Sequence, residues 1–326
     1  MAVAEEMMAE PISLTIGGRS HWGVALFDDE AAGERDDVQI SNDALLTFSG
    51  STVLDNGVEV AIRIEVEGEK ASDNADAKFA ELSGSFGAIR VGNDDVAGKK
   101  MATLAPYATY FYGINDAYWS FSYSSAFDGA TSGQTWTDTY ANAGVGASAN
   151  LTYFSPVING FQFGATYVPE AGQEAPSGTA PVGKGNDAVS VGLRYDGAFG
   201  DTGIAASFGF TNHDGAEVTT SEWGAGLVVS MMGVSLGGSM SVQDDESNDD
   251  LTQMDLGISY GEGAWTVSAN VGNATDDDAN IDTDFARLLA NYNLGPGINV
   301  AGALGNDSPI TGNDTSFAGI ALGISF

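Results

Sequence analysis

The chain has 326 residues, no cysteine, and 45 acidic against 11 basic residues, which gives a formal net charge of −34 at pH 7. The missing cysteines exclude disulfide and thiol chemistry, and the negative charge argues against binding of nucleic acid phosphates. No apolar run approaches the roughly 18 residues of a membrane-spanning helix. A spanning strand stays open, because it needs only about ten residues with every second one apolar.

Residues 1–11 are predicted to be an N-terminal tail, and residues 12–326 a single β-barrel domain. The segment Ala2-Val3-Ala4 has the small-x-small pattern that ends a secretory signal peptide, while the basic and apolar regions of such a peptide are missing. Two interpretations stay open. The tail is a signal-peptide remnant with a mature start near Glu5, or it is an ordinary N-terminal extension.

Strict alternation of side chains is the strongest pattern further along the chain. From Val58 to Val66 one face is apolar, and the other face reads Glu59, Ala61, Arg63, Glu65 and Glu67. The same alternation returns at 189–196, 253–260 and 318–326. A period of two indicates strands with one apolar and one polar face.

The connections between these segments also alternate, between short and long. Short glycine-containing turns are expected at 55–57, 83–85, 156–160, 231–233, 261–263 and 295–297. Longer, mostly acidic loops are expected at 28–36, 69–75, 94–146, 169–185, 213–217, 244–250, 274–280 and 307–313. This rhythm predicts an all-β transmembrane antiparallel barrel of about 16 strands, each about ten to sixteen residues long, with short periplasmic turns and long extracellular loops. A soluble β-sandwich would also alternate, but its strands are shorter and its turns lack this rhythm.

Three stretches resemble the general-diffusion porins of Gram-negative bacteria, of the alphaproteobacterial type. They are Ser13-Leu14-Thr15-Ile16-Gly17-Gly18-Arg19, the hairpin from Leu82 to Gly92, and the terminal Gly323-Ile324-Ser325-Phe326. The resemblance implies a sixteen-stranded barrel in the outer membrane, a homotrimer, contacts with outer-membrane lipids and lipopolysaccharide, and a third loop folded into each pore. Segment 94–146 stands where that loop belongs.

The resemblance also implies a pore constriction in which basic wall residues face acidic groups. Arg19, Arg63 and Arg90 match wall positions of the family, and alternation also turns Arg194 and Arg287 inward. On the acidic side we expect Asp43, Glu65 and Glu67 on the wall, with Asp116 and Asp128 on the loop. The resemblance thus implies a water-filled channel for passive diffusion of small hydrophilic solutes and ions. Compared with the family pattern this wall is less basic, which predicts that the channel favours cations.

Two alternatives to a passive channel stay open. Loop 94–146 is rich in tyrosine, tryptophan and phenylalanine, so its rings either pack the loop against the wall or form a track for sugars or apolar solutes. The first alternative is therefore a substrate-specific channel that uses this loop, and the second is a structural or adhesive barrel.

Catalysis is not expected, because the two histidines, His21 and His213, are far apart and no nucleophile or zinc motif accompanies them. No cofactor is predicted to be required. The outer acidic loops are either solvated or hold Ca²⁺ through Asp276, Asp278 and Asp282.

Overall fold

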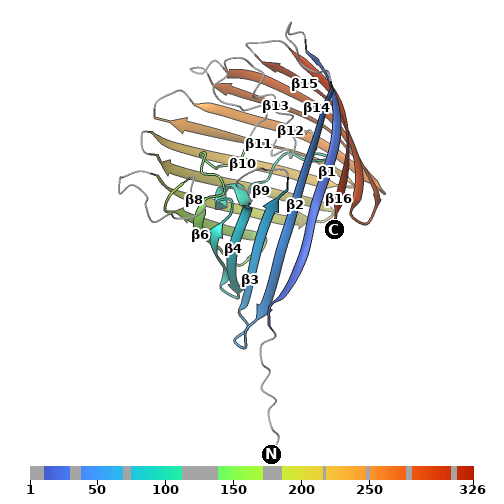
Figure 1. Ribbon diagram of the computed structural model, residues 1–326. Coiled ribbons are helices and arrows are strands. Elements are labelled where there is room, and N and C mark those ends of the chain that lie inside the picture. Colours follow the sequence, from blue (N-terminus) through green and yellow to red (C-terminus); the bar gives the residue numbers. More distant parts are fainter. Residues whose placement is uncertain are drawn as a thin grey trace, which may run out of the picture.

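A computed structural model describes residues 11–29, 38–68, 75–111, 139–171, 186–215, 218–246, 250–276, 281–309 and 314–326. Sixteen antiparallel strands, each paired with its neighbours in sequence, close into one barrel (Figure 1). The prediction of a sixteen-stranded transmembrane barrel is confirmed. The predicted tail, 1–11, lies outside the described residues except for its last residue.

The strands of the first half are β1 (Ser13–Asp29), β2 (Val38–Val53), β3 (Glu59–Glu67), β4 (Ala75–Gly84), β5 (Gly87–Asn93), β6 (Ala149–Phe154), β7 (Phe161–Val168) and β8 (Asp187–Phe199). Those of the second half are β9 (Thr202–Asp214), β10 (Thr219–Met231), β11 (Val234–Asp245), β12 (Leu251–Glu262), β13 (Trp265–Asp276), β14 (Ile281–Gly295), β15 (Ile298–Pro309) and β16 (Thr315–Ser325). One short helix, α1 (Ala97–Lys100), follows β5.

Alternation sorts the side chains between the two faces of the wall. On β1, Trp22, Val24 and Leu26 are exposed on the outer face, whereas His21 and Ala25 are buried inside the barrel. A barrel in lipid needs an apolar outer face, while its inner face can be polar. The closed sheet also pairs the backbone polar groups, so that none is left facing lipid. Within the described residues, no helix has the length and apolar character needed to cross a bilayer.

The two ends of the chain close the barrel. Arg19 pairs with Ser325 in the ladder between β1 and β16. The amide of Phe326 donates to the carbonyl of Gly18 at 3.1 Å, and the amide of Gly18 donates to the carbonyl of Phe326 at 2.9 Å. The terminal aromatic residue is therefore part of the seam that joins the first strand to the last.

Short turns join the strands at one end of the barrel, as the glycine pattern predicts. Gly297 lies at φ 70° in the β14–β15 turn, and a Cβ there would lie 2.0 Å from the carbonyl oxygen of Ser325. Only glycine fits such a position without strain. The sequence analysis omitted one further turn, at Gly200 and Asp201 between β8 and β9.

Strand length divides the wall into two sectors. The strands β3 to β7 have 6 to 10 residues, whereas all others have 11 to 17. Figure 1 shows this low sector as the short blue-to-green arrows of the barrel. The expectation of strands of about ten to sixteen residues is therefore wrong for most of the low sector. At β5 the strand ends at Asn93, where loop 94–146 leaves the wall.

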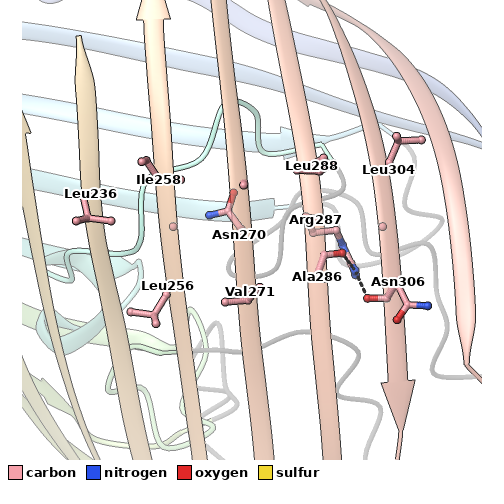
Figure 2. A pocket seen from close by; sticks show the side chains of 13 residues that line it. Leu236, Leu256, Ile258, Asn270, Val271, Ala286, Arg287, Leu288, Leu304 and Asn306 are labelled. Atoms are coloured by element: carbon pink, nitrogen blue, oxygen red, sulfur yellow. Dashed lines mark hydrogen bonds between the residues drawn. The ribbon is translucent and has the colours of Figure 1, made fainter. Parts of the chain in front are cut away.

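The outer face is apolar over much of its height. A hollow of about 500 Å³ opens on it between β11 and β15, where Ala286 lies among larger side chains such as Leu256, Leu288 and Leu304 (Figure 2). The guanidinium of Arg287 points away from this hollow and donates to the carbonyl of Asn306 at 3.0 Å. Because its lining is apolar, this hollow suits lipid chains rather than hydrophilic solutes.

Candidate functional site

The lumen of the barrel is the candidate site, and the described parts of loop 94–146 lie against its wall. Helix α1 packs against β7, β8 and β9. The amide of Ala97 donates to Thr166 Oγ1 at 2.9 Å, and the amide of Gly98 donates to Ser190 Oγ at 2.9 Å. Inward hydroxyl groups thus satisfy loop amides that would otherwise be buried without an acceptor.

The same pattern continues around the wall. The amide of Thr103 donates to Ser207 Oγ on β9 at 2.7 Å, and the amide of Ala108 donates to Ser268 Oγ on β13 at 3.0 Å. In the opposite sense, Asn270 Nδ2 donates to the carbonyl of Pro106 at 3.0 Å. Small polar side chains on the inner faces of β7, β8, β9 and β13 therefore bind the loop backbone. We call this set of hydrogen bonds the docking track.

Inward glycines let the loop approach the wall closely. A Cβ at Gly226 on β10 would lie 1.7 Å from the carbonyl oxygen of Thr103, and one at Gly257 on β12 would lie 2.5 Å from that of Pro106. Neither position has room for a side chain, so these glycines are needed for loop contact rather than for turn geometry.

Phe111 ends this described stretch in an apolar socket. Its ring is 4% exposed and packs with Ala25, Leu289 and Phe317 on the inner faces of β1, β14 and β16. The His21 ring meets it edge-on, with centroids 4.6 Å apart. The loop is thus anchored across from its starting strand, β5.

Glu222 anchors the returning part of the loop. Its side chain is buried on the inner face of β10, and its Oε2 accepts hydrogen bonds from the amides of Asn142 at 2.9 Å and Ala143 at 2.7 Å. Sequence analysis missed this residue. Two glycines on one face of a strand, such as Gly224 and Gly226, mark a place where another backbone comes close. A lone carboxylate on that same face was therefore the available sequence signal for an acceptor of loop amides.

Two of the predicted basic residues lie on the inner wall beside carboxylates. Arg19 Nε donates to Asp43 Oδ2 at 3.2 Å, and His21 Nδ1 lies 3.2 Å from the same oxygen. Arg63 Nε donates to Glu65 Oε1 at 2.7 Å, and the Arg63 side chain is 48% exposed. Arg63 therefore offers more of its surface to the lumen than Arg19, whose side chain is 24% exposed.

Arg90 joins a larger network at the start of the loop. Its Nη2 donates to Glu81 Oε2 at 2.7 Å, and its Nη1 pairs with Asp94. Lys100 Nζ lies 2.6 Å from Asp94 Oδ1. Arg90 also lies over the Phe79 ring, 4.0 Å from its centroid. This network fixes the point at which the loop leaves β5.

Arg194 and Arg287 have structural contacts inside the barrel. Arg194 Nη1 donates to the carbonyl of Ala102 in the loop at 3.0 Å, and its Nε donates to Asp196 Oδ2 at 2.6 Å. The Arg287 side chain is 5% exposed, pairs with Asp307 and lies over the Phe317 ring. Their predicted place at the constriction stays a prediction.

The predicted acidic residues fall into two groups. Asp43 and Glu65 are buried on the inner face of the wall, and Glu67 is partly buried on the face that it shares with Glu65. Asp116 and Asp128 lie outside the described residues. That these two loop carboxylates face the basic wall across the pore is therefore also a prediction.

Of the predicted calcium ligands, Asp276 and Asp282 lie at the loop ends of β13 and β14. Asp278 and the side chain of Asp276 are outside the described residues. Asp282 Oδ1 accepts a hydrogen bond from Asn273 Nδ2 at 3.2 Å. Among the side chains that the structure describes, no group of three or more histidines and carboxylates is placed to hold a metal ion.

Comparison with known proteins agrees with this architecture. Residues 1–309 match the model of a family described as Gram-negative porin. No curated protein matches the sequence.

Several solved structures share the fold. An anion-selective porin from Comamonas acidovorans is 17% identical, with a TM-score of 0.67, and the match covers 97% of this chain and 100% of that one. A loop-deletion mutant of OmpT, an outer membrane protein of Vibrio cholerae, is 13% identical with a TM-score of 0.67 over 97% and 100% of the two chains. A mutant of Rhodopseudomonas blastica porin is 18% identical with a TM-score of 0.61 over 96% and 100%.

Proposed function

The chain belongs to the Gram-negative porin family, and on that premise we propose that its channel favours cations over anions. It is an outer-membrane porin through which small solutes pass, and it is a channel rather than an enzyme. In such a pore the fixed charges along the lumen decide which ions are enriched there.

One observation carries the proposal. Each of the five arginines predicted to face inward contacts at least one carboxylate: Asp43 for Arg19, Glu65 for Arg63, Glu81 and Asp94 for Arg90, Asp196 for Arg194, and Asp307 for Arg287. The positive charge of the wall is therefore offset locally. Further carboxylates lie on the inner face of the described wall, among them Glu67 and Glu222. Their fixed negative charge favours cations in the lumen.

Selectivity has to be argued from these charges rather than from the fold. The Comamonas porin has the same fold and is described as anion-selective. At 17% identity the likeness concerns the fold alone and does not decide which ions the present pore prefers. The paired arginines support the opposite preference for the present chain.

The direct test is a reversal potential. The purified full-length protein is inserted into a planar bilayer that separates two KCl concentrations. We expect a potential whose sign indicates preference for K⁺ over Cl⁻, and the preference should weaken as salt rises, because the Debye length shrinks from about 10 Å at 0.1 M to about 3 Å at 1 M. Preference for chloride at low salt would refute the proposal, and a closed barrel without conductance would indicate the structural or adhesive alternative.

We also propose a homotrimer in which the low sector of the wall is covered by neighbouring copies. A strand needs about nine to eleven residues to cross the hydrocarbon core, and β5 has 7 and β6 has 6. Lipid contact along these strands would therefore be poorly matched, whereas contact with a second copy would bury their exposed Val91 and Leu151. Light scattering of the detergent-solubilised protein should give three times the chain mass, and a monomer would contradict the assembly.

Contacts with outer-membrane lipids and lipopolysaccharide are proposed for the strands outside the low sector, whose outer faces carry exposed apolar side chains such as Leu236, Leu256 and Leu304. Calcium at the outer loops stays a prediction for Asp276, Asp278 and Asp282. A fall in melting temperature with chelator, restored by Ca²⁺ and unaffected by Mg²⁺, would support it. An unchanged melting temperature would count against it.

A further inference from the structure

A cavity in the lumen has the lining of a ligand site rather than of a plain water channel. It has a volume of about 430 Å³ and lies between the loop and the inner face of β14, β15, β16 and β1. Its polar lining includes Arg19, His21, Tyr110, Asn291, Asn293 and Asn299. Sites for small molecules have volumes of about 300 to 1,000 Å³, so this cavity has the size of one.

The ring of Tyr110 is held at this cavity from both sides. On one side, the amide of Ala108 is bonded to Ser268, and Tyr107 meets Tyr110 edge-on with centroids 5.0 Å apart. On the other side, Phe111 is fixed in its apolar socket. Tyr110 itself remains 49% exposed. The loop therefore presents a flat aromatic face at low entropic cost, because its neighbours are already anchored.

Opposite the loop, the asparagines supply both donors and acceptors. Asn299 Nδ2 donates to Asn291 Oδ1 at 2.6 Å, which orients the two amides. Within the described residues, no hydrogen bond involves Asn291 Nδ2 or Asn299 Oδ1. Groups that donate and accept side by side match hydroxyl groups, which do the same.

The charge of the cavity points to a neutral ligand. Arg19 and His21 both lie 3.2 Å from Asp43 Oδ2. The carboxylate offsets the positive charge of Arg19, so an anion gains little from entering. Arg19 still adds directional donors to the rim of the cavity.

From this combination we propose that the cavity binds a neutral sugar of one or two rings, with its apolar ring face on Tyr110 and its hydroxyl groups on Asn291 and Asn299. The inference rests on the proposed diffusion channel and adds a binding step within it. Solute that rests at the cavity would transiently obstruct ion flow, so binding is measurable as a saturable loss of current.

The experiment uses the full-length protein in a planar bilayer, with glucose and maltose added in steps up to saturation. We expect the current to fall along a binding curve. Tyr110→Ala should weaken the apparent affinity about tenfold, since an aromatic contact contributes up to about 1.5 kcal/mol. Tyr110→Phe keeps the ring and should retain most of the affinity, whereas Asn299→Ala should weaken it.

Arg63→Gln serves as the matched control, because Arg63 does not line the cavity. This variant should change the reversal potential and leave sugar affinity unchanged. A fall in current that is linear in sugar and equal in wild type and Tyr110→Ala would overturn the proposal. Saturable block by acetate or benzoate but not by sugars would overturn the neutral-ligand assignment.

The same recordings separate the two proposals. Saturable sugar block in a chloride-preferring channel would refute the cation preference and keep the sugar site. Cation preference without sugar block would refute the sugar site and keep the cation preference. If Tyr110→Ala does not assemble, Asn299→Ala and Tyr110→Phe still distinguish a specific site from bulk obstruction.

Discussion

The inner wall of β7 to β13 and the inner wall of β1 to β5 carry different side chains and have different contacts. The first, the loop-bearing sector, has mainly glycine, serine and threonine facing inward, and residues 97–108 and 139–143 of the loop pack on it. The second, the charged sector, has Arg19, Arg63 and Arg90 paired with carboxylates. From this difference we expect one sector to hold the loop in place and the other to set the electric field of the pore.

The largest effect is expected from Gly226→Val in the loop-bearing sector. A Cβ there would lie 1.7 Å from the backbone oxygen of Thr103, so the loop cannot stay on the wall. Even ordinary overpacking costs about 1–3 kcal/mol. Trypsin should then cleave after Lys99 and Lys100, which in the native loop lie 3.3 Å and 2.6 Å from carboxylate oxygens of Asp95 and Asp94.

Gly302→Val is the matched control for this prediction. Gly302 also lies in a strand, but an added Cβ would have its nearest neighbour at 3.9 Å. Cleavage at the two lysines should stay at the wild-type level. Equal protection of Gly226→Val and Gly302→Val would show that the loop is not held by close contact with β10.

Glu222→Ala should open the returning part of the loop without releasing the whole. The amides of Asn142 and Ala143 would lose their acceptor, and a buried donor without a partner costs about 1–3 kcal/mol. Hydrogen exchange at these two amides should accelerate. Glu222→Gln keeps one acceptor oxygen and should give an intermediate rate, and identical rates in all three proteins would contradict the role.

Ser207→Ala tests a single hydrogen bond of the docking track and should destabilise the loop less than Glu222→Ala does. Only the Ser207 Oγ acceptor of the Thr103 amide is removed, and a net hydrogen bond contributes about 0.5–1.5 kcal/mol. Exchange of the Thr103 amide should rise by a corresponding factor of about 2 to 12. Ser230→Ala, which removes a hydroxyl bonded to Ser235 near a turn, should leave the Thr103 amide unchanged.

The two sectors also differ in how far sequence alone predicts them. Alternation predicts which residues share the inner face of each strand, so Arg19, Arg63 and Asp43 could be placed inside from their neighbours. Alternation does not predict how far along the barrel axis, or where around the wall, a side chain lies. The contact of Arg194 with the loop at Ala102 spans 92 residues, and that of Ala108 with Ser268 spans 160. Such contacts depend on how far around the wall the loop runs, and no local pattern contains that information.

Glycine shows the same limit more sharply. Gly57 and Gly297 are predictable from turn chemistry, because both have positive φ next to a short connection. Gly226 and Gly257 lie within strands, where a sequence pattern indicates only a weak strand or a close approach. These two positions need glycine because the loop backbone, more than a hundred residues earlier in the chain, packs directly against them. An inner face made of glycine and serine is thus the sequence signal of a docked loop, once the barrel is known.

The last prediction separates the sectors by function. Glu65→Gln combined with Glu67→Gln removes two carboxylates from the inner face of β3 and leaves Arg63 with less compensation. A unit charge about 7 Å from a permeating ion contributes at most about 0.6 kcal/mol in water. This is about threefold in the local concentration of each ion, with opposite sign for K⁺ and Cl⁻, and salt reduces it further. The ratio of K⁺ to Cl⁻ permeability should therefore fall by a modest factor that grows at low salt.

Glu262→Gln is the control, because Glu262 lies at the exposed end of β12 and accepts its hydrogen bond from Tyr260. Cleavage after Lys99 should be unchanged in the charge variants and increased in Gly226→Val. If the double variant released the loop, or if Gly226→Val alone controlled selectivity, the two sectors would not be separable. If the outcomes divide as expected, selectivity can be altered on β3 without disturbing the docked part of loop 94–146.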